Sequence, residues 1–147
     1  MSQIEVSIAT EATEEVVDAF SRLIPQLSTT ASAPDRELIA QIISAPSNTV
    51  LLARDRSNGA RIVGTLTLVM FRIPTGLRAM IEDVVVDERR RGRGVAAALT
   101  RAALDRARAA GARTVDLTSR PSRVAANRLY QKLGFVQRET NAYRFAL

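Results

Sequence analysis

The feature that most constrains the fold is one stretch, residues 81–110, which reads IEDVVVDERRRGRGVAAALTRAALDRARAA. The valine run at positions 84–86 is β-branched and apolar, as is typical of a buried strand. An alanine-rich segment follows and favours a helix. The loop between them is rich in arginine and glycine, and its residues are Arg89, Arg90, Arg91, Gly92, Arg93 and Gly94. The stretch therefore predicts a strand, a glycine-containing loop and a helix N-terminus in direct succession.

This loop has the chemistry of an anion site. The first-turn N–H groups of a helix lack intrahelical partners and lie at the positive end of its dipole, so a phosphate suits them. Gly92 and Gly94 allow positive φ and close approach of the ligand to the backbone. An arginine run is more often a solvated surface, and glycine before a helix is often only a turn. The coincidence of strand, Gly-Arg-Gly and helix favours a pyrophosphate site.

The loop also satisfies a dinucleotide-binding pattern. Residues 92–97 fill G-x-G-x-x-G/A, and Asp116 follows about twenty residues later, where a ribose-binding acid is expected. In that fold the first glycine follows the strand almost directly and the unit opens the domain. Here residues 87–91 intervene and a long segment precedes, so a nucleotide-binding module is a weaker alternative.

Composition narrows the class of protein. A chain of 147 residues with 46% hydrophobic content suits a single globular domain over residues 1–147. Cysteine and histidine are both absent, which excludes disulfides, thiolate metal sites and a cysteine acyl-enzyme, and we expect no metal. No secretory signal or apolar run of about 18 residues is evident, so we expect a cytoplasmic protein without membrane contact.

The positive charge is concentrated in one half of the chain. The formal net charge is +6, made up of −2 over residues 1–76 and +8 over residues 77–147. A basic half is compatible with nucleic acid as well as with a phosphorylated cofactor. The chain has only two Tyr, four Phe and no Trp for base stacking, so no nucleic acid partner is expected.

The remaining pattern predicts an α+β fold with the element order βααβββαβαββ. Turn signals, such as Ser57-Asn58-Gly59, separate the elements, and Pro25 is expected to bend or end the first helix. The expected strands are 4–9, 48–55, 61–72, 78–86, 114–118, 135–139 and 143–147, and the expected helices are 11–27, 35–45, 92–110 and 123–133.

Two sequence blocks resemble the GNAT superfamily of N-acetyltransferases. The acyl-CoA loop signature of that family, Q/R-x-x-G-x-G/A, is filled by Arg91, Gly94 and Ala96, or two residues earlier by Arg89, Gly92 and Gly94. Residues 127–135, NRLYQKLGF, resemble its late L-Y-x-x-x-G-F block. The resemblance implies the GNAT fold: a mixed, mainly antiparallel sheet of six to seven strands with helices on both faces.

The resemblance also implies a cofactor site. In the family, acyl-CoA lies in a wedge where the sheet splays beside the central strand, so acetyl-CoA is the expected co-substrate. The pantetheine arm would pair with the backbone of Val84, Val85 and Val86. The pyrophosphate would bind Arg91, Gly92, Arg93, Gly94, Val95 and Ala96. Tyr130 matches the tyrosine that acts as general acid for the leaving thiolate, although a tyrosine on an amphipathic helix is more often a packing residue. Arg123 stands where many relatives carry asparagine, and could meet a CoA phosphate.

Two carboxylates on the central strand are the candidates for acceptor binding. Glu82 is our first candidate general base, acting directly or through water, because it lies beside Val84 and on its face in a regular strand. Asp83 would then point to the opposite face, unless a bulge reverses the alternation. The alternative is that both are simply solvated or salt-bridged. Residues 81–86 also resemble the same strand of glucosamine-6-phosphate N-acetyltransferases, where the acidic pair lies near the acceptor.

We therefore interpret the chain as an enzyme that moves acetyl from acetyl-CoA to a primary amine of a small molecule, by direct attack in a ternary complex. A peptide or protein amine is the alternative acceptor. An inactive CoA-binding or nucleotide-binding module is the further alternative. Dimers are common in the family, and a homodimer would use the C-terminal strands as its interface.

Overall fold

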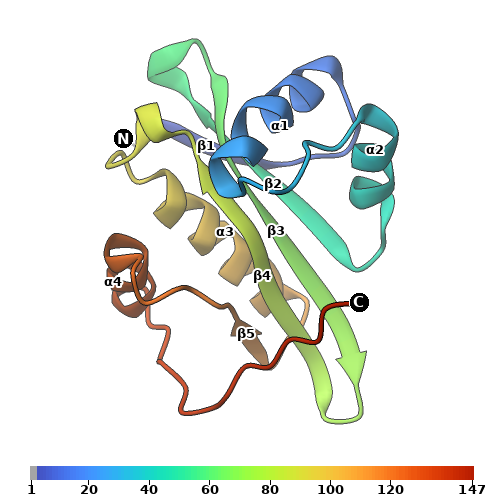
Figure 1. Ribbon diagram of the computed structural model, residues 1–147, viewed down its shortest axis with the longest axis vertical. Coiled ribbons are helices and arrows are strands. Elements are labelled where there is room, and N and C mark those ends of the chain that lie inside the picture. The colour runs from blue at the N-terminus through green and yellow to red at the C-terminus, as the bar shows by residue number, and fades with distance from the viewer. Residues whose placement is uncertain (1–2) are drawn as a thin grey trace. The chain divides into compact units, whose positions relative to one another are not determined.

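A computed structural model describes residues 3–147, so the first two residues of the expected domain lie outside the description. The chain divides into two compact units, Met1–Leu117 and Thr118–Leu147. The second unit contains one helix, α4 (Val124–Lys132). The first unit contains the elements β1 (Ile4–Ile8), α1 (Glu14–Leu27), α2 (Arg36–Ser44), β2 (Asn48–Asp55), β3 (Arg61–Ile73), β4 (Gly76–Val86), α3 (Val95–Ala109) and β5 (Thr114–Asp116) (Figure 1).

The strands of the first unit form one sheet in the order β1-β2-β3-β4-β5. The first four strands are antiparallel to their neighbours, whereas β5 runs parallel to β4. Figure 1 shows α1 and α2 on one face of this sheet and α3 on the other. The expected α+β class, with a mixed and mainly antiparallel sheet, is confirmed.

The expected strand number is wrong. Within residues 3–147 the sheet has five strands, not six to seven, and the element order is βααβββαβα. Residues 135–139 and 143–147 form no strand, and four of their five large apolar side chains are exposed: Val136, Tyr143, Phe145 and Leu147. Alternation of apolar residues records only the propensity for a strand, whereas a strand also needs a neighbour for its N–H and C=O groups.

The helix boundaries follow from capping. Thr13 caps α1 by accepting a hydrogen bond from the N–H of Val16, and Asp35 caps α2 through Leu38. Helix α1 does not end at Pro25, as one reading of the sequence predicted, but continues for two more residues. Proline removes one N–H donor. The next turn is nevertheless closed, because the N–H of Ser28 donates to the carbonyl of Ile24 at 3.0 Å.

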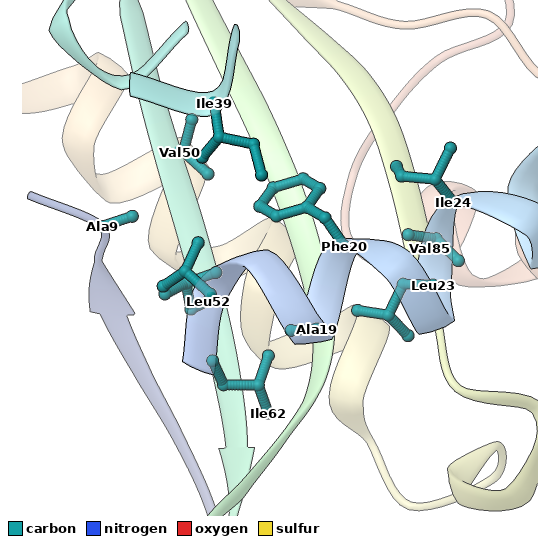
Figure 2. Close-up of a cluster of buried hydrophobic side chains, with 11 residues drawn as sticks. Ala9, Ala19, Phe20, Leu23, Ile24, Ile39, Val50, Leu52, Ile62 and Val85 are labelled. Carbon is teal, nitrogen blue, oxygen red and sulfur yellow. The ribbon is translucent and has the colours of Figure 1, made fainter. Parts of the chain in front are cut away.

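One hydrophobic core joins α1 and α2 to the sheet. Phe20, Leu23 and Ile39 from the helices pack on Val50 and Leu52 of β2, and Figure 2 shows the aromatic ring between helix and strand. Val85 of β4 belongs to the same cluster. Burial of such side chains contributes roughly 1.5–3 kcal/mol each. The core therefore fixes α1 against the strand that carries the candidate site.

Helix α3 packs on the other face of the sheet, at a position where β3 carries a glycine. A Cβ at Gly64 of β3 would lie 2.9 Å from Cγ1 of Val95 and 3.2 Å from Cδ1 of Leu99. Val95 is the first residue of α3, and both side chains are buried. The absence of a side chain at this position therefore sets how closely the start of α3 approaches the sheet.

The first prediction concerns this contact. Gly64→Ala should lower the free energy of unfolding by about 1–3 kcal/mol, because the added methyl group overpacks the interface. Hydrogen exchange at the first turn of α3 should become faster. Gly111→Ala is the control: its Cβ meets open space but its φ is +83°, so it should cost only backbone strain of about 1 kcal/mol and leave that turn unchanged. Wild-type stability of Gly64→Ala in denaturant titration would contradict the prediction.

Candidate functional site

A β-bulge interrupts β4 at the two candidate carboxylates. Thr67 of β3 pairs with Glu82, but Thr65 pairs with Val85, so the single residue between the threonines faces two residues of β4. Asp83 lies within this bulge and has a φ of +49°, the left-handed region. For a residue with a side chain that region costs roughly 1 kcal/mol, and aspartate tolerates it better than most.

The bulge decides which face each side chain takes. Thr65 and Thr67 are two residues apart and so share a face, and directly paired residues share a face as well. Glu82 therefore lies on the face of Val85, the face covered by α1, and not on the face of Val84 that a regular strand would give it. The expectation that Glu82 shares a face with Val84 is therefore wrong, because the strand contains the bulge that was named only as the alternative. Both Glu82 and Asp83 are exposed.

Beyond the bulge, β4 has an open edge. Strand β5 pairs with β4 only from Arg78 to Met80. Within residues 3–117, no strand pairs with residues 82–86 on that side. Their N–H and C=O groups can therefore receive an extended ligand as an additional strand. The side chain of Val85 is buried in the core, so only its main chain could serve a ligand.

The loop after β4 leads to an uncapped helix. Gly92 and Gly94 have φ of +76° and +80°, and a Cβ on either would meet nothing within 4 Å. Gly94 precedes α3, and no side chain caps the helix. Its first-turn N–H groups are therefore available to an anion. Arg91 and Arg93 are exposed beside them, whereas the side chain of Val95 is buried and could contribute only its N–H.

The four arginines of the loop do not share one role. Arg90 lies 3.7 Å from Oδ2 of Asp55, a carboxylate that is only 1% exposed at the end of β2. The N–H and hydroxyl of Ser57 donate to Oδ1 of Asp55. These hydrogen bonds, with smaller contributions from the charges of Arg90 and Arg93, hold the pKa of Asp55 below its ordinary value although burial opposes them.

Helix α1 holds the start of the same loop. Arg22 lies 3.7 Å from the carboxylate of Asp87, and the side-chain carbonyl of Gln26 accepts a hydrogen bond of 2.8 Å from the N–H of Glu88. The sequence analysis missed Arg22, Gln26 and Asp55. No sequence pattern points to them, because they lie 30 or more residues from the loop that they hold.

The two remaining candidate residues lie in the second unit. Tyr130 of α4 is 7% exposed and makes an edge contact with Phe135, at 5.8 Å between ring centroids. Burial raises the pKa of Tyr130 above its ordinary value, and the nearby charge of Arg123 acts in the opposite direction. Arg123 directly precedes α4. Tyr130 therefore packs against Phe135, and its phenol stays protonated at neutral pH.

The structure thus gathers the candidate residues 82–96 in the first unit, and Tyr130 with Arg123 in the second. Residues 3–147 contain no group of three or more side chains that could hold a metal ion. None of the helices described over that range is long and apolar enough to cross a membrane.

Comparison with known proteins decides the family. The sequence profile of the acetyltransferase (GNAT) family matches residues 13–135. The chain belongs to this family. The dinucleotide interpretation of residues 92–97 is therefore wrong, and the sheet shows why: that fold is built on a mostly parallel sheet, whereas among the strands described within residues 3–147 only β4 and β5 are parallel.

Solved GNAT structures resemble the whole chain. An acetyltransferase from Trypanosoma brucei is 26% identical over 98% of this chain and 99% of its own, with a TM-score of 0.77. A glucosamine-6-phosphate N-acetyltransferase from Arabidopsis thaliana is 21% identical, covers 97% of both chains and has a TM-score of 0.80. A ribosomal-protein-alanine N-acetyltransferase from Brucella melitensis is 17% identical over 98% and 99%, with a TM-score of 0.77. No curated protein sequence matches significantly.

The second prediction concerns Asp55, the buried carboxylate that pairs with Arg90 in the loop after β4. A carboxylate whose folded pKa is depressed stabilises the fold above its unfolded pKa of about 3.9, and this contribution is lost as the pH falls through the folded pKa. Asp55→Asn should therefore lower the melting temperature at pH 7, and the difference from wild type should shrink as the pH falls below about 4. Thermal melts from pH 2.5 to 7 measure this. Asp105→Asn is the control, because Asp105 is 78% exposed, and should change little at any pH. A pH-independent difference for Asp55→Asn would contradict the prediction.

Proposed function

We propose that this GNAT protein transfers the acetyl group of acetyl-CoA to a primary amine of a small molecule, by direct attack within a ternary complex. The observation that carries the proposal is the open edge of β4 beside the uncapped N-terminus of α3. One element suits an amide-bearing extended arm and the next suits a pyrophosphate, and both lie on one continuous segment. CoA presents these two groups in succession.

The residues present fit this co-substrate. The backbone of residues 84–86 would pair with the pantetheine arm, in the manner of a strand added to a sheet edge. The N–H groups at Gly92, Gly94, Val95 and Ala96 would hold the pyrophosphate, since the two glycines leave open space beside the backbone. Arg91 and Arg93 would add charge-assisted hydrogen bonds. Arg123 is assigned to a CoA phosphate on the family resemblance alone.

Each proposed residue has one task in the chemistry. Acetyl-CoA supplies the acetyl group as a thioester. The amine nitrogen forms a bond to the carbonyl carbon, the carbon–sulfur bond breaks, and the amine proton goes to Glu82 directly or through water. Asp83 would help to bind the ammonium form of the acceptor. Tyr130 would donate a proton to the leaving sulfur, which its raised pKa permits because the phenol is protonated at neutral pH.

The same experiments also test the alternative acceptors and the inactive module. Structures similar to this chain include a glucosamine-6-phosphate N-acetyltransferase and a ribosomal-protein-alanine N-acetyltransferase, so a peptide or protein amine is the second acceptor class. A CoA-binding protein without turnover is the third reading. The expectations of a cytoplasmic location, a homodimer and no nucleic acid or membrane partner remain predictions from sequence.

The third prediction tests cofactor binding. Acetyl-CoA and CoA should both bind saturably in a calorimetric titration, and Arg91→Ala and Arg93→Ala should each weaken binding about tenfold, the value of one charge-assisted contact of about 1.4 kcal/mol. Arg101→Ala is the matched control, because Arg101 is an exposed arginine of α3 outside the loop. Equal affinities for all three variants would remove the pyrophosphate assignment.

The fourth prediction tests the general acid. Tyr130→Phe should lower kcat by roughly 100-fold, the lower range for general acid catalysis, and leave the affinity for acetyl-CoA unchanged. The chain has only one other tyrosine, Tyr143, which is 90% exposed. Tyr143→Phe is therefore the control and should retain full activity in an assay of thiol release. An unchanged kcat in Tyr130→Phe would remove this role, and binding without turnover of any amine would favour the inactive module.

A further inference from the structure

A partly exposed apolar strip of the sheet lies on the α1 and α2 side of the β3–β4 hairpin. Strand β2 begins at Asn48, which pairs with Val69 of β3. Beyond this row β3 and β4 continue together, as the long hairpin at the lower end of the sheet in Figure 1. Phe71 and Ile73 of this extension are 38% and 42% exposed. Because they are two residues apart on one strand, both side chains lie on the same face.

The strand register puts this apolar strip on the face of Glu82. Between Thr67 and Phe71 the pairing with β4 is regular: Thr67 with Glu82, Val69 with Met80 and Phe71 with Arg78. These three rows share one face, because they are separated by two residues on each strand. Rows on one face are about 6.7 Å apart. Glu82 therefore lies at one end of a strip of apolar side chains, and Phe71 lies about 13 Å away at the other end.

The charges along the strip are asymmetric. Glu82 and Asp83 stand at one end, both exposed, and neither forms an ion pair among residues 3–147 that the structure records. At the other end, Arg78 donates to the hydroxyls of Thr114 and Thr75 at 3.2 and 2.9 Å. Two of the five N–H donors of the arginine are thus used by neutral partners, and no ion pair among residues 3–147 neutralises its charge. The strip has a negative end, an apolar middle and a positive far end.

We propose that the acceptor is an amphipathic primary amine, an arylalkylamine or alkylamine with its ammonium group at Glu82 and its apolar body along Val69, Met80 and Phe71. This proposal rests on the proposed acetyltransferase function and names its substrate class. The two ends of such a ligand match the strip: a cation meets unpaired carboxylates, and an apolar body removes exposed apolar surface from water.

A sugar amine fits the same strip poorly. Its hydroxyl groups would lie against Val69 and Met80, whose side chains offer no hydrogen bond, and each hydroxyl placed there loses its bonds to water on binding. A peptide amine would bring polar backbone groups to the same apolar positions. All three classes present an ammonium group to Glu82, so it is the apolar middle of the strip that favours the amphipathic amine.

The test compares acceptors with the full-length chain and acetyl-CoA. We expect kcat/KM for 2-phenylethylamine to exceed that for glucosamine 6-phosphate, and that for a tripeptide with a free N-terminal alanine, by at least about tenfold, the discrimination that a hydrophobic contact of this size supports. Release of the CoA thiol measures turnover. A higher kcat/KM for the sugar phosphate or for the tripeptide overturns the proposal.

Two variants distinguish the loss of a contact with the amine from a general effect on folding. Phe71→Ser should raise the KM for 2-phenylethylamine about tenfold while the KM for acetyl-CoA stays unchanged. The matched control is Ile8→Ser: Ile8 is 43% exposed on β1, and its loss should leave both constants unchanged. An unchanged amine KM in Phe71→Ser overturns the proposal.

Binding measurements distinguish failure of the proposed acetyltransferase function from failure of the proposed amine site. Failure of acetyl-CoA to bind in calorimetry would refute the proposed function, and saturation-transfer NMR with 2-phenylethylamine alone then tests the strip directly. Binding that Phe71→Ser abolishes and Ile8→Ser retains would support the strip as an amphipathic amine site. No binding of 2-phenylethylamine, or binding that Phe71→Ser leaves intact, overturns it.

Discussion

The pairing of β3 with β4, including its bulge, is the constraint on which the rest of the candidate site depends. Because one residue of β3 faces two of β4, every side chain after the bulge changes face relative to a regular strand. Val85 thereby enters the core beneath α1, and Glu82 shares its face. Without the bulge, Glu82 would share a face with Val84, so either Val84 would replace Val85 in the core or the carboxylate would turn toward α3.

Long-range polar contacts then hold the loop that follows. Asp55 reaches Arg90 from the end of β2, while Arg22 and Gln26 reach Asp87 and Glu88 from α1. Because Asp55 is almost fully buried, loss of Arg90 would leave mainly the two hydrogen bonds from Ser57 to stabilise its charge. The arginines divide accordingly, with Arg90 used to hold the loop and Arg91 and Arg93 left exposed. Because these contacts hold the loop in place, the N-terminus of α3 does not depend on a side-chain cap for its position.

Much of this organisation could be predicted from local sequence. The valine run, the Gly-Arg-Gly loop and the alanine-rich segment do form β4, the loop and α3, and Asn48 to Asp55 is β2 with the expected bounds. These elements depend on propensity and periodicity, which act over a few residues. The C-terminal strands failed for the opposite reason: residues 143–147 alternate correctly, but alternation does not supply a neighbouring strand.

The sequence by itself determined the family, the order of the first nine elements and the position of the glycine loop, because these follow from residue type and spacing along the chain. Only the tertiary structure decided the face taken by Glu82, the separate role of Arg90 and the partly exposed apolar strip that ends at Phe71. Each of these depends on the register between two strands or on a contact across 30 or more residues. Such pairings are selected by the packing of the whole sheet and not by the sequence near either partner.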